Sequence, residues 1–200
     1  MRRVLCICSL IPSIPLETKI LILMHHRELK TTTNTGRLAA LALPNSEIRI
    51  RGKTTAPLDL SDLQTSGQKI LLLYPSEDAH ELTPEFVATL ERPITLVVPD
   101  GNWRQAAKVG QREPALATAT RVKLAPGPLS EYRLRAEPKA EGLATLEAIA
   151  RALGVLESIR VRTQIETFFR IMVERTLWSR GLLKAEDCTG GIPPEALVKR

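Results

Sequence analysis

Cysteine is scarce in this 200-residue chain, and its three cysteines cannot form a disulfide framework. A small, odd number of cysteines is typical of proteins that work in a reducing compartment. We therefore expect a cytoplasmic protein. A third histidine near His25 and His26 is also missing, so we interpret these two as solvent-facing or structural and predict no metal site.

Long hydrophobic runs are absent as well. No apolar stretch approaches the roughly 20 residues that span a bilayer. The basic and then apolar start is interrupted by Pro12 and Pro15, and no small-residue cleavage site follows. From these absences we expect no secretory signal and no membrane partner. The chain also contains no internal repeat and no low-complexity tract.

Positive charge is in excess. Lys and Arg number 28 against 22 Asp and Glu, which gives a net charge of +6. A basic surface favours phosphate-rich partners, although a basic protein without such a partner fits the charge equally well. The hydrophobic fraction of 44% is ordinary for one globular domain with a small appendage.

Strand-like and helix-like segments alternate along the chain. Residues 19–25, 69–74 and 94–98 are continuous apolar runs, as in central strands covered on both faces, and residues 47–51 and 121–124 are alternating. Helical patterns cover residues 35–43, 83–90, 102–110, 141–153 and 157–180, and Gly154 is the expected C-cap of the fourth helix. This order predicts an α/β fold with a mostly parallel sheet flanked by helices.

The strongest local pattern for function follows the strand at 94–98. The chain turns at Pro99-Asp100-Gly101, and a helix then begins near Trp103. Ligands of α/β sheets bind beyond the carboxyl ends of strands, where free N–H groups of a helix start favour anions. Asp100 is therefore a candidate catalytic residue. The simpler alternatives are a helix cap for Asp100 and a core anchor for Trp103.

Other polar motifs also lie near strand ends. They comprise residues 25–28 with 34–39, residues 73–77, and residues 132–135 with 145–148. Glu147, on a mainly apolar helix, either points into a site or is exposed. In an α/β protein, polar motifs at the ends of several strands together form one cleft, so we expect these motifs to line a common cleft.

In this order the motifs resemble the DTW-domain family, whose bacterial members look like tRNA-uridine aminocarboxypropyltransferases. The matching stretches, which extend over residues 5–178, are LCICSLIP (5–12), NTGRLA (34–39), LLYPS (72–76), PDGNWRQA (99–106), YRLR (132–135) and TLEA (145–148). Six motifs in order are far more specific than any one of them.

Three features depart from the family pattern. Two further cysteines usually precede the Cys-x-Cys pair, so Cys6 and Cys8 are either the remnant of a zinc knuckle or follow a start that lies upstream. The name-giving Asp-Thr-Trp is DGNW here (100–103), closer to members with Asp-Gly-Thr-Trp. Ala144 stands where the family usually has Ser.

The resemblance also implies an architecture and a reaction. The family is similar to SPOUT-type knotted methyltransferases, which implies a C-terminal trefoil knot holding S-adenosylmethionine. The expected parts are a Cys-containing extension (1–18), a catalytic domain (19–182) and a C-terminal tail (183–200). The expected reaction moves the 3-amino-3-carboxypropyl group to N3 of a tRNA uridine and releases methylthioadenosine.

Specific residues are expected to carry this chemistry. Asp100 would accept the N3 proton, and Trp103 would stack on a base or pack below the loop. The expected cofactor-binding residues are Leu73, Tyr74, Pro75, Pro99, Gly101, Tyr132, Arg133, Leu134, Thr145 and Glu147, with Arg133 or Arg135 on the methionine carboxylate. The expected RNA-binding residues are Asn34, Thr35, Gly36, Arg37 and Arg104.

Competing functions remain open at this point. They are an RNA methyltransferase of the SPOUT type, an rRNA aminocarboxypropyltransferase and a non-catalytic RNA-binding module. We expect a monomer or weak homodimer, because the apolar face of residues 157–180 is either core or an interface.

Overall fold

The computed structural model describes residues 5–53, 55, 57–65, 67–134 and 142–197. Within these residues, six strands form one sheet whose neighbouring pairs are all parallel, in the order β2-β1-β5-β3-β6-β4. The strands are β1 (Lys19–His25), β2 (Ser46–Arg51), β3 (Lys69–Leu73), β4 (His80–Glu81), β5 (Ile94–Asp100) and β6 (Thr120–Lys123). The predicted α/β fold is confirmed, and the described sheet is wholly rather than mostly parallel.

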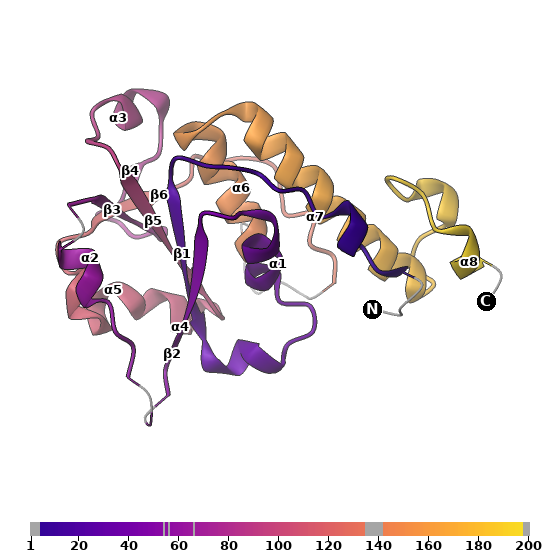
Figure 1. Ribbon diagram of the computed structural model, residues 1–200, viewed down its shortest axis with the longest axis horizontal. Coiled ribbons are helices and arrows are strands. Elements are labelled where there is room, and N and C mark those ends of the chain that lie inside the picture. Colours follow the sequence, from indigo (N-terminus) through magenta and orange to yellow (C-terminus); the bar gives the residue numbers. More distant parts are fainter. Residues whose placement is uncertain (1–4, 54, 56, 66, 135–141, 198–200) are drawn as a thin grey trace.

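Helices cover both faces of this sheet (Figure 1). They are α1 (Thr35–Ala42), α2 (Ser61–Thr65), α3 (Pro84–Ala88), α4 (Trp103–Ala107), α5 (Val109–Arg112), α6 (Thr145–Leu156), α7 (Ile159–Ser179) and α8 (Pro194–Leu197). Short 3-10 turns are η2 (Cys8–Leu10), η3 (His26–Lys30), η4 (Pro114–Leu116) and η5 (Ala185–Asp187).

Successive side chains of each central strand point to opposite faces of the sheet, where they belong to two separate cores. Ile20 and Ile22 of β1 belong to the larger core, which α1, α3, α6 and α7 cover. Leu21 and Leu23 point to the opposite face, where α2, α5 and η4 complete a smaller core. Because β1 is buried on both faces, its apolar run is continuous, as expected for a central parallel strand.

Helix α6 does not end at Gly154 as predicted. It continues to Leu156, and Glu157 is its C-cap. A Cβ at Gly154 would lie 2.8 Å from Cδ of Arg162 on α7. The glycine therefore allows the side chain of α7 to approach the backbone of α6, which is a packing role rather than a capping one.

The two ends of the described chain pack together at the far end of α7. Leu5 lies with Trp178, Cys188 and Ala196 in a small third core, and Figure 1 shows both ends beside the last turns of α7. The predicted extension and tail thus share one cluster. Within the described residues, no helix is long and apolar enough to cross a membrane. The trefoil knot stays a prediction.

Candidate active site

A cavity of about 810 Å³ opens where the carboxyl ends of the strands meet, hereafter the carboxyl edge. Its size falls in the usual range for small-molecule sites. The predicted site residues that line it are Asn34, Thr35, Leu73, Tyr74, Pro75, Pro99, Asp100, Gly101, Trp103, Tyr132 and Thr145. Motifs distant in the sequence therefore converge on one space.

Asp100 is the last residue of β5 and lies in the wall of this cavity. The strand extends through it because Met24 of β1 pairs with Asp100, so the turn begins at Gly101, two residues later than predicted. Only 5% of the residue is exposed. Its Oδ2 accepts a hydrogen bond from Nδ2 of Asn34 at 2.7 Å, and its Oδ1 accepts one from the Thr145 hydroxyl.

The start of α1 is built around that carboxylate. The Asn34 side chain caps α1 by accepting from the backbone N–H of Arg37 at 3.0 Å. A Cβ at Gly36 would lie 3.0 Å from Oδ2 of Asp100, so glycine permits the close approach. The Thr35 hydroxyl accepts from the backbone N–H of Leu146 and joins α1 to α6. Two of these predicted RNA-binding residues, Asn34 and Gly36, therefore lie against Asp100.

Trp103 opens α4 and forms another part of the wall. Asn102 and Gln105 exchange side-chain and backbone hydrogen bonds at 2.9 Å, and this capping box fixes the helix start. The Trp103 ring is half-buried, and its centroid lies 6.3 Å from that of Tyr74 in an edge-on arrangement. The two ring planes are inclined at 61°, so each ring offers its own face or edge that a base or adenine can contact.

Arg51 anchors α4 from the end of β2. Its buried guanidinium donates to the backbone carbonyl of Gln105 at 3.1 Å, and its Nε lies 3.5 Å from Oε1 of Glu113. Only the sheet order brings the end of β2 near α4, so the sequence offered no pattern for this contact. Arg51 holds the helix that carries Trp103.

Glu147 stabilises the wall without lining it. The buried carboxylate accepts from the Ser130 hydroxyl, from the backbone N–H of Glu131 at 2.7 Å and from that of Ala144 at 2.9 Å. It therefore joins the segment after β6 to the start of α6. Glu147 had been expected to contact the cofactor, and the structure places it behind the cavity wall instead.

The YRLR motif divides between wall, surface and core. Tyr132 lines the cavity, and its hydroxyl donates to the backbone carbonyl of Thr33 at 2.7 Å. Leu134 is buried in the larger core, whereas Arg133 is exposed and does not line the cavity. Arg135, the other expected carboxylate ligand, lies outside the described residues.

Two cations in the cavity wall were not predicted. Lys123 ends β6, and Arg151 lies on the same face of α6 as Thr145 and Ala148. The Arg151 guanidinium donates to the backbone carbonyl of Pro128 at 2.6 Å. The spacing 145, 148, 151 is helical, so the periodicity of α6 was a pattern that could have identified Arg151.

The remaining predicted RNA-binding residues are at the surface. Arg37 is exposed and donates to the backbone carbonyl of Leu29, and Arg104 is exposed on α4. Neither side chain lines the cavity.

A comparison of the amino-acid sequence with models of protein families identifies the family of this chain. The DTW domain family matches residues 1–177, nearly the whole chain. This chain belongs to the DTW domain family.

The chain is also similar to named proteins. The chain is 37% identical over 162 residues to the tRNA-uridine aminocarboxypropyltransferase 2 of Drosophila melanogaster. The matched stretch covers 78% of this chain and 63% of that protein. The chain is 29% identical over 157 residues to the protein of the same name from Macaca fascicularis, covering 76% and 53%. The DTW chain thus spans little more than half to under two thirds of these relatives' length. No solved structure matches it.

The cysteine pair of the DTW chain lies away from the cavity. Cys6 and Cys8 are exposed, with Sγ atoms 2.9 Å apart. The side-chain hydrogen bond between the two thiols is the main cause that lowers the pKa of the Cys6 thiol. Among the residues that the structure describes, no three His, Cys, Asp or Glu side chains lie close enough together to hold a metal ion.

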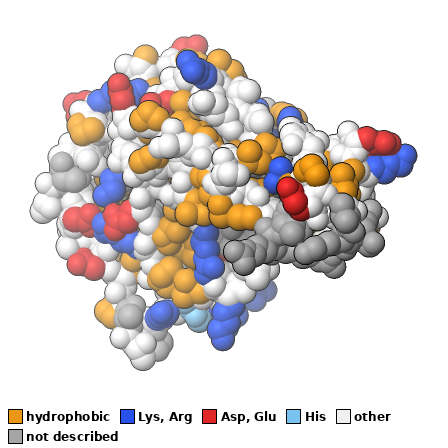
Figure 2. All heavy atoms as spheres, turned by 45° about the vertical axis from the view of Figure 1, so that its right-hand side comes forward, with side chains coloured by type: hydrophobic (Ala, Val, Ile, Leu, Met, Phe, Trp, Pro, Cys, Tyr) orange, Lys and Arg blue, Asp and Glu red, His pale blue; other side chains and the backbone are white. Residues whose placement is uncertain are grey.

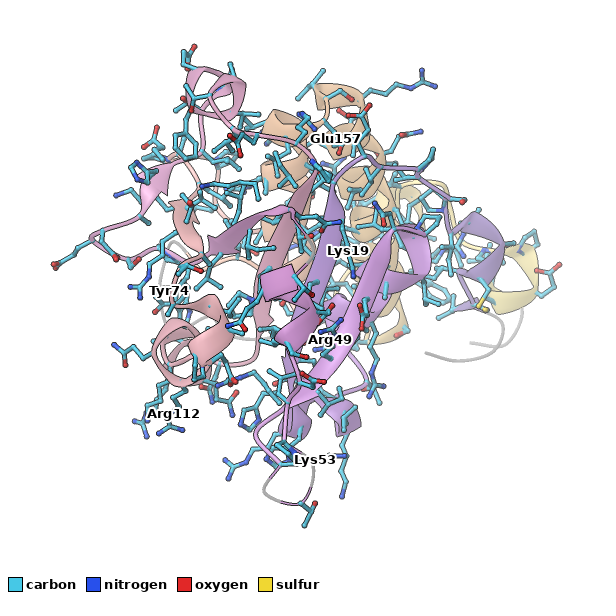
Figure 3. All side chains as sticks on the ribbon, turned by 60° about the vertical axis from the view of Figure 1, so that its left-hand side comes forward. Lys19, Arg49, Lys53, Tyr74, Arg112 and Glu157 are labelled. Carbon is cyan, nitrogen blue, oxygen red and sulfur yellow. The ribbon has the colours of Figure 1, made fainter. Side chains whose placement is uncertain are left out.

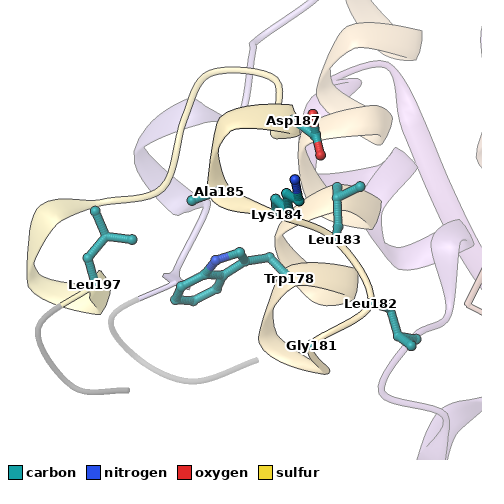
Figure 4. Close-up of a pocket in the computed structure, with 8 residues that line it drawn as sticks. All are labelled: Trp178, Gly181, Leu182, Leu183, Lys184, Ala185, Asp187 and Leu197. Carbon is teal, nitrogen blue, oxygen red and sulfur yellow. The ribbon is translucent and has the colours of Figure 1, made fainter.

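A second hollow of about 470 Å³ lies at the end of α7 in the DTW chain (Figure 4). Trp178 forms its floor, and Lys184 and Asp187 are the charged residues in its lining. Five of the six motifs shared with the family contribute residues to the cavity at the carboxyl edge instead, whereas Leu5 of the sixth packs against Trp178.

Proposed function

We propose that this chain transfers the 3-amino-3-carboxypropyl group of S-adenosylmethionine to N3 of a tRNA uridine. The observation that carries the proposal is Asp100, a buried carboxylate in the cavity wall whose two oxygens are held by Asn34 and Thr145. The names of the relatives supply the reaction class. The low cysteine content supports a cytoplasmic location.

The cavity wall suits the proposed donor. Apolar side chains of Leu73, Val98 and Leu124 offer a surface for adenine, and Lys123 and Arg151 offer cations for a carboxylate. Glu28 and Glu81 add acidic groups to the lining, which suit the donor's ammonium. When bound, the donor supplies an electrophilic methylene next to its sulfonium.

Asp100 acts as the general base in this proposal. Its carboxylate takes the N3 proton of uridine while N3 forms a bond to the methylene carbon. The carbon–sulfur bond breaks, its electron pair stays on sulfur, and methylthioadenosine leaves. The hydrogen bonds from Asn34 and Thr145 keep the carboxylate oriented, so that less freedom is lost when the uridine binds.

The remaining wall residues orient the two substrates. N3 of uridine is paired in duplex RNA, so the base must be unpaired or turned out before Asp100 can reach it. Trp103 and Tyr74 provide the aromatic surface on which that base or the adenine stacks. Selectivity against methyl transfer is a matter of geometry, because the wall must aim the methylene and not the methyl at N3.

The direct test is to incubate the purified protein with tRNA and S-adenosylmethionine and to analyse the nucleosides by mass spectrometry. We expect an aminocarboxypropyl group on uridine. A methyl group would instead identify a methyltransferase, and tRNA binding without donor affinity would identify a non-catalytic RNA-binding module. tRNA from a strain that lacks the protein should lack the same modification.

Asp100→Ala tests the assigned base. The variant should lose at least ~100-fold in transfer rate, since general bases contribute about 10²–10⁴-fold, and donor binding by calorimetry should be largely retained. Arg133→Ala is a matched control, because that side chain is exposed and does not line the cavity. Full activity in the Asp100 variant would remove this residue from the mechanism.

A further inference from the structure

Many cations of this chain are neutralised by an acidic neighbour. Arg49 pairs with both Glu47 and Asp62, at 2.7 and 2.6 Å. Further ion pairs join Lys19–Glu47, Arg92–Glu17, Arg121–Asp78, Arg162–Glu166, Arg170–Glu131 and Lys184–Glu186. On these parts of the surface the net charge is therefore small.

Several cations of the carboxyl edge have no such partner. We define the basic rim as Arg27, Lys30, Lys53, Arg104, Lys108 and Arg112. These side chains are exposed, or half-exposed for Lys108, and none forms an ion pair with a residue that the structure describes. Figure 3 shows Lys53 and Arg112 at the same end of the molecule.

The basic rim borders the candidate active site. Helix α4 lines the cavity with Trp103 and Ala106, while Arg104 follows Trp103 on the same helix but lies outside the cavity lining. On the β1 side, a Cβ at the cavity residue Gly101 would lie 3.3 Å from Cβ of His25. Figure 2 shows Lys and Arg side chains on both sides of a histidine at this lower end.

Local electrostatics agree with an excess of positive charge at the basic rim. Burial is the largest cause that lowers the pKa of His25, and the neighbouring His26, Arg51 and Arg27 lower it further. The His25 and His26 rings lie 4.6 Å apart. Burial disfavours charge of either sign, whereas the contributions of His26, Arg51 and Arg27 indicate positive potential at His25, which Glu28 opposes.

We infer that the basic rim binds the RNA phosphates that flank the uridine in the cavity. This inference rests on the proposed function and assigns the surface along which the substrate strand lies. An RNA backbone places negative charges in series, and unpaired Arg and Lys bind them while releasing counterions. The rim continues the cavity wall along α4, so a strand whose base enters the cavity passes over it.

Two double variants test the rim. Arg104→Gln with Lys108→Gln removes charge from the α4 side, and Arg27→Gln with Lys53→Gln removes it from the β1–β2 side. Each pair should weaken tRNA binding about tenfold near 0.1 M salt and lower the slope of log affinity against log salt by about 2. Calorimetry with S-adenosylmethionine should give unchanged donor affinity.

The matched control is Lys69→Gln with Arg160→Gln, which removes the same charge at the opposite edge of the sheet. Lys69 begins β3, and Arg160 lies in the first turn of α7. The control should bind tRNA with nearly the salt slope of the wild type. Equal losses in control and rim variants would overturn the inference and indicate a general charge effect.

The outcome separates the rim from the proposed function. If the wild type transfers the aminocarboxypropyl group while both rim variants keep their tRNA affinity and salt slope, the inference about the basic rim is wrong and the proposed function is supported. If the rim variants lose tRNA affinity but the wild type transfers nothing, RNA binding by the basic rim is supported and the proposed function is wrong. Unchanged thermal unfolding of each variant shows that its loss of tRNA affinity is local.

Discussion

Asp100 takes its orientation from side chains at the starts of two helices. Asn34 precedes α1, Thr145 begins α6, and each donates to a different oxygen of the carboxylate. A buried carboxylate needs such partners, because an unpaired charge in a poorly solvated place is costly. The same contacts fix the direction from which a proton can be accepted.

Thr145→Val should therefore lower the transfer rate. Loss of one donor to a charged acceptor costs about 1.5–3 kcal/mol, which corresponds to roughly 10–100-fold. Thr145→Ser keeps the hydroxyl and should restore most of the rate. Single-turnover kinetics with saturating donor would measure the effect, and a fully active Val variant would show that the hydroxyl does not orient the base.

Arg151 is the cavity cation that we expect to bind the donor's carboxylate, in place of Arg133. Arg151→Gln should weaken binding of S-adenosylmethionine by roughly 10–100-fold, as for a lost hydrogen bond between charged groups. Methylthioadenosine lacks the carboxylate, so its affinity should be unchanged. Both are measured by calorimetry.

Arg133→Gln is the control for that prediction, because this side chain is exposed. Equal losses for both ligands in the Arg151 variant would indicate that the contact to Pro128 matters, and not the carboxylate.

At the scale of elements, the position of α4 depends on a side chain from another part of the chain. Helix α4 has five residues, too few to be stable by itself. Its capping box fixes where it begins, and Arg51 binds the carbonyl of Gln105 within it. The aromatic wall is thus held by strand β2.

Arg51→Met should destabilise the protein by about 1–3 kcal/mol, because the backbone carbonyl of the half-buried Gln105 and the carboxylate of Glu113 lose their donor. Urea unfolding measures the change. Arg170→Met is the control: Arg170 pairs with Glu131 through side chains that are 41% and 50% exposed, so its loss should cost only about 0–1 kcal/mol. A similar cost for both variants would argue against the anchoring role of Arg51.

Element types were predictable where the pattern was long or strongly apolar. Strand β1 matches its predicted bounds, because a strand buried on both faces is a continuous apolar run. The two-residue β4 and the five-residue α2 were missed, since neither is long enough to show a period. The sequence prediction made Gly154 the C-cap of its helix. A glycine that ends a helix and one that allows close packing by Arg162 cannot be distinguished from the sequence alone.

At the scale of the whole molecule, the sheet order decides which residues meet. Placing β5 between β1 and β3 brings Asp100 beside the loops that follow both strands. It also puts the ends of β2 and β1 next to α4, which collects the basic rim on one edge. These neighbours are far apart in the chain, so no local pattern reports them.

The sequence by itself determined the class of fold, the types of the longer elements and the family, and it made Asp100 the candidate base, because apolar periodicity and ordered motifs are local. Only the tertiary structure decided that Asn34 and Thr145 hold Asp100, that Glu147 stands behind the wall, and that Arg151 lies in it. Those facts depend on how strands and helices pack, and a side chain's role follows from the neighbours that packing gives it.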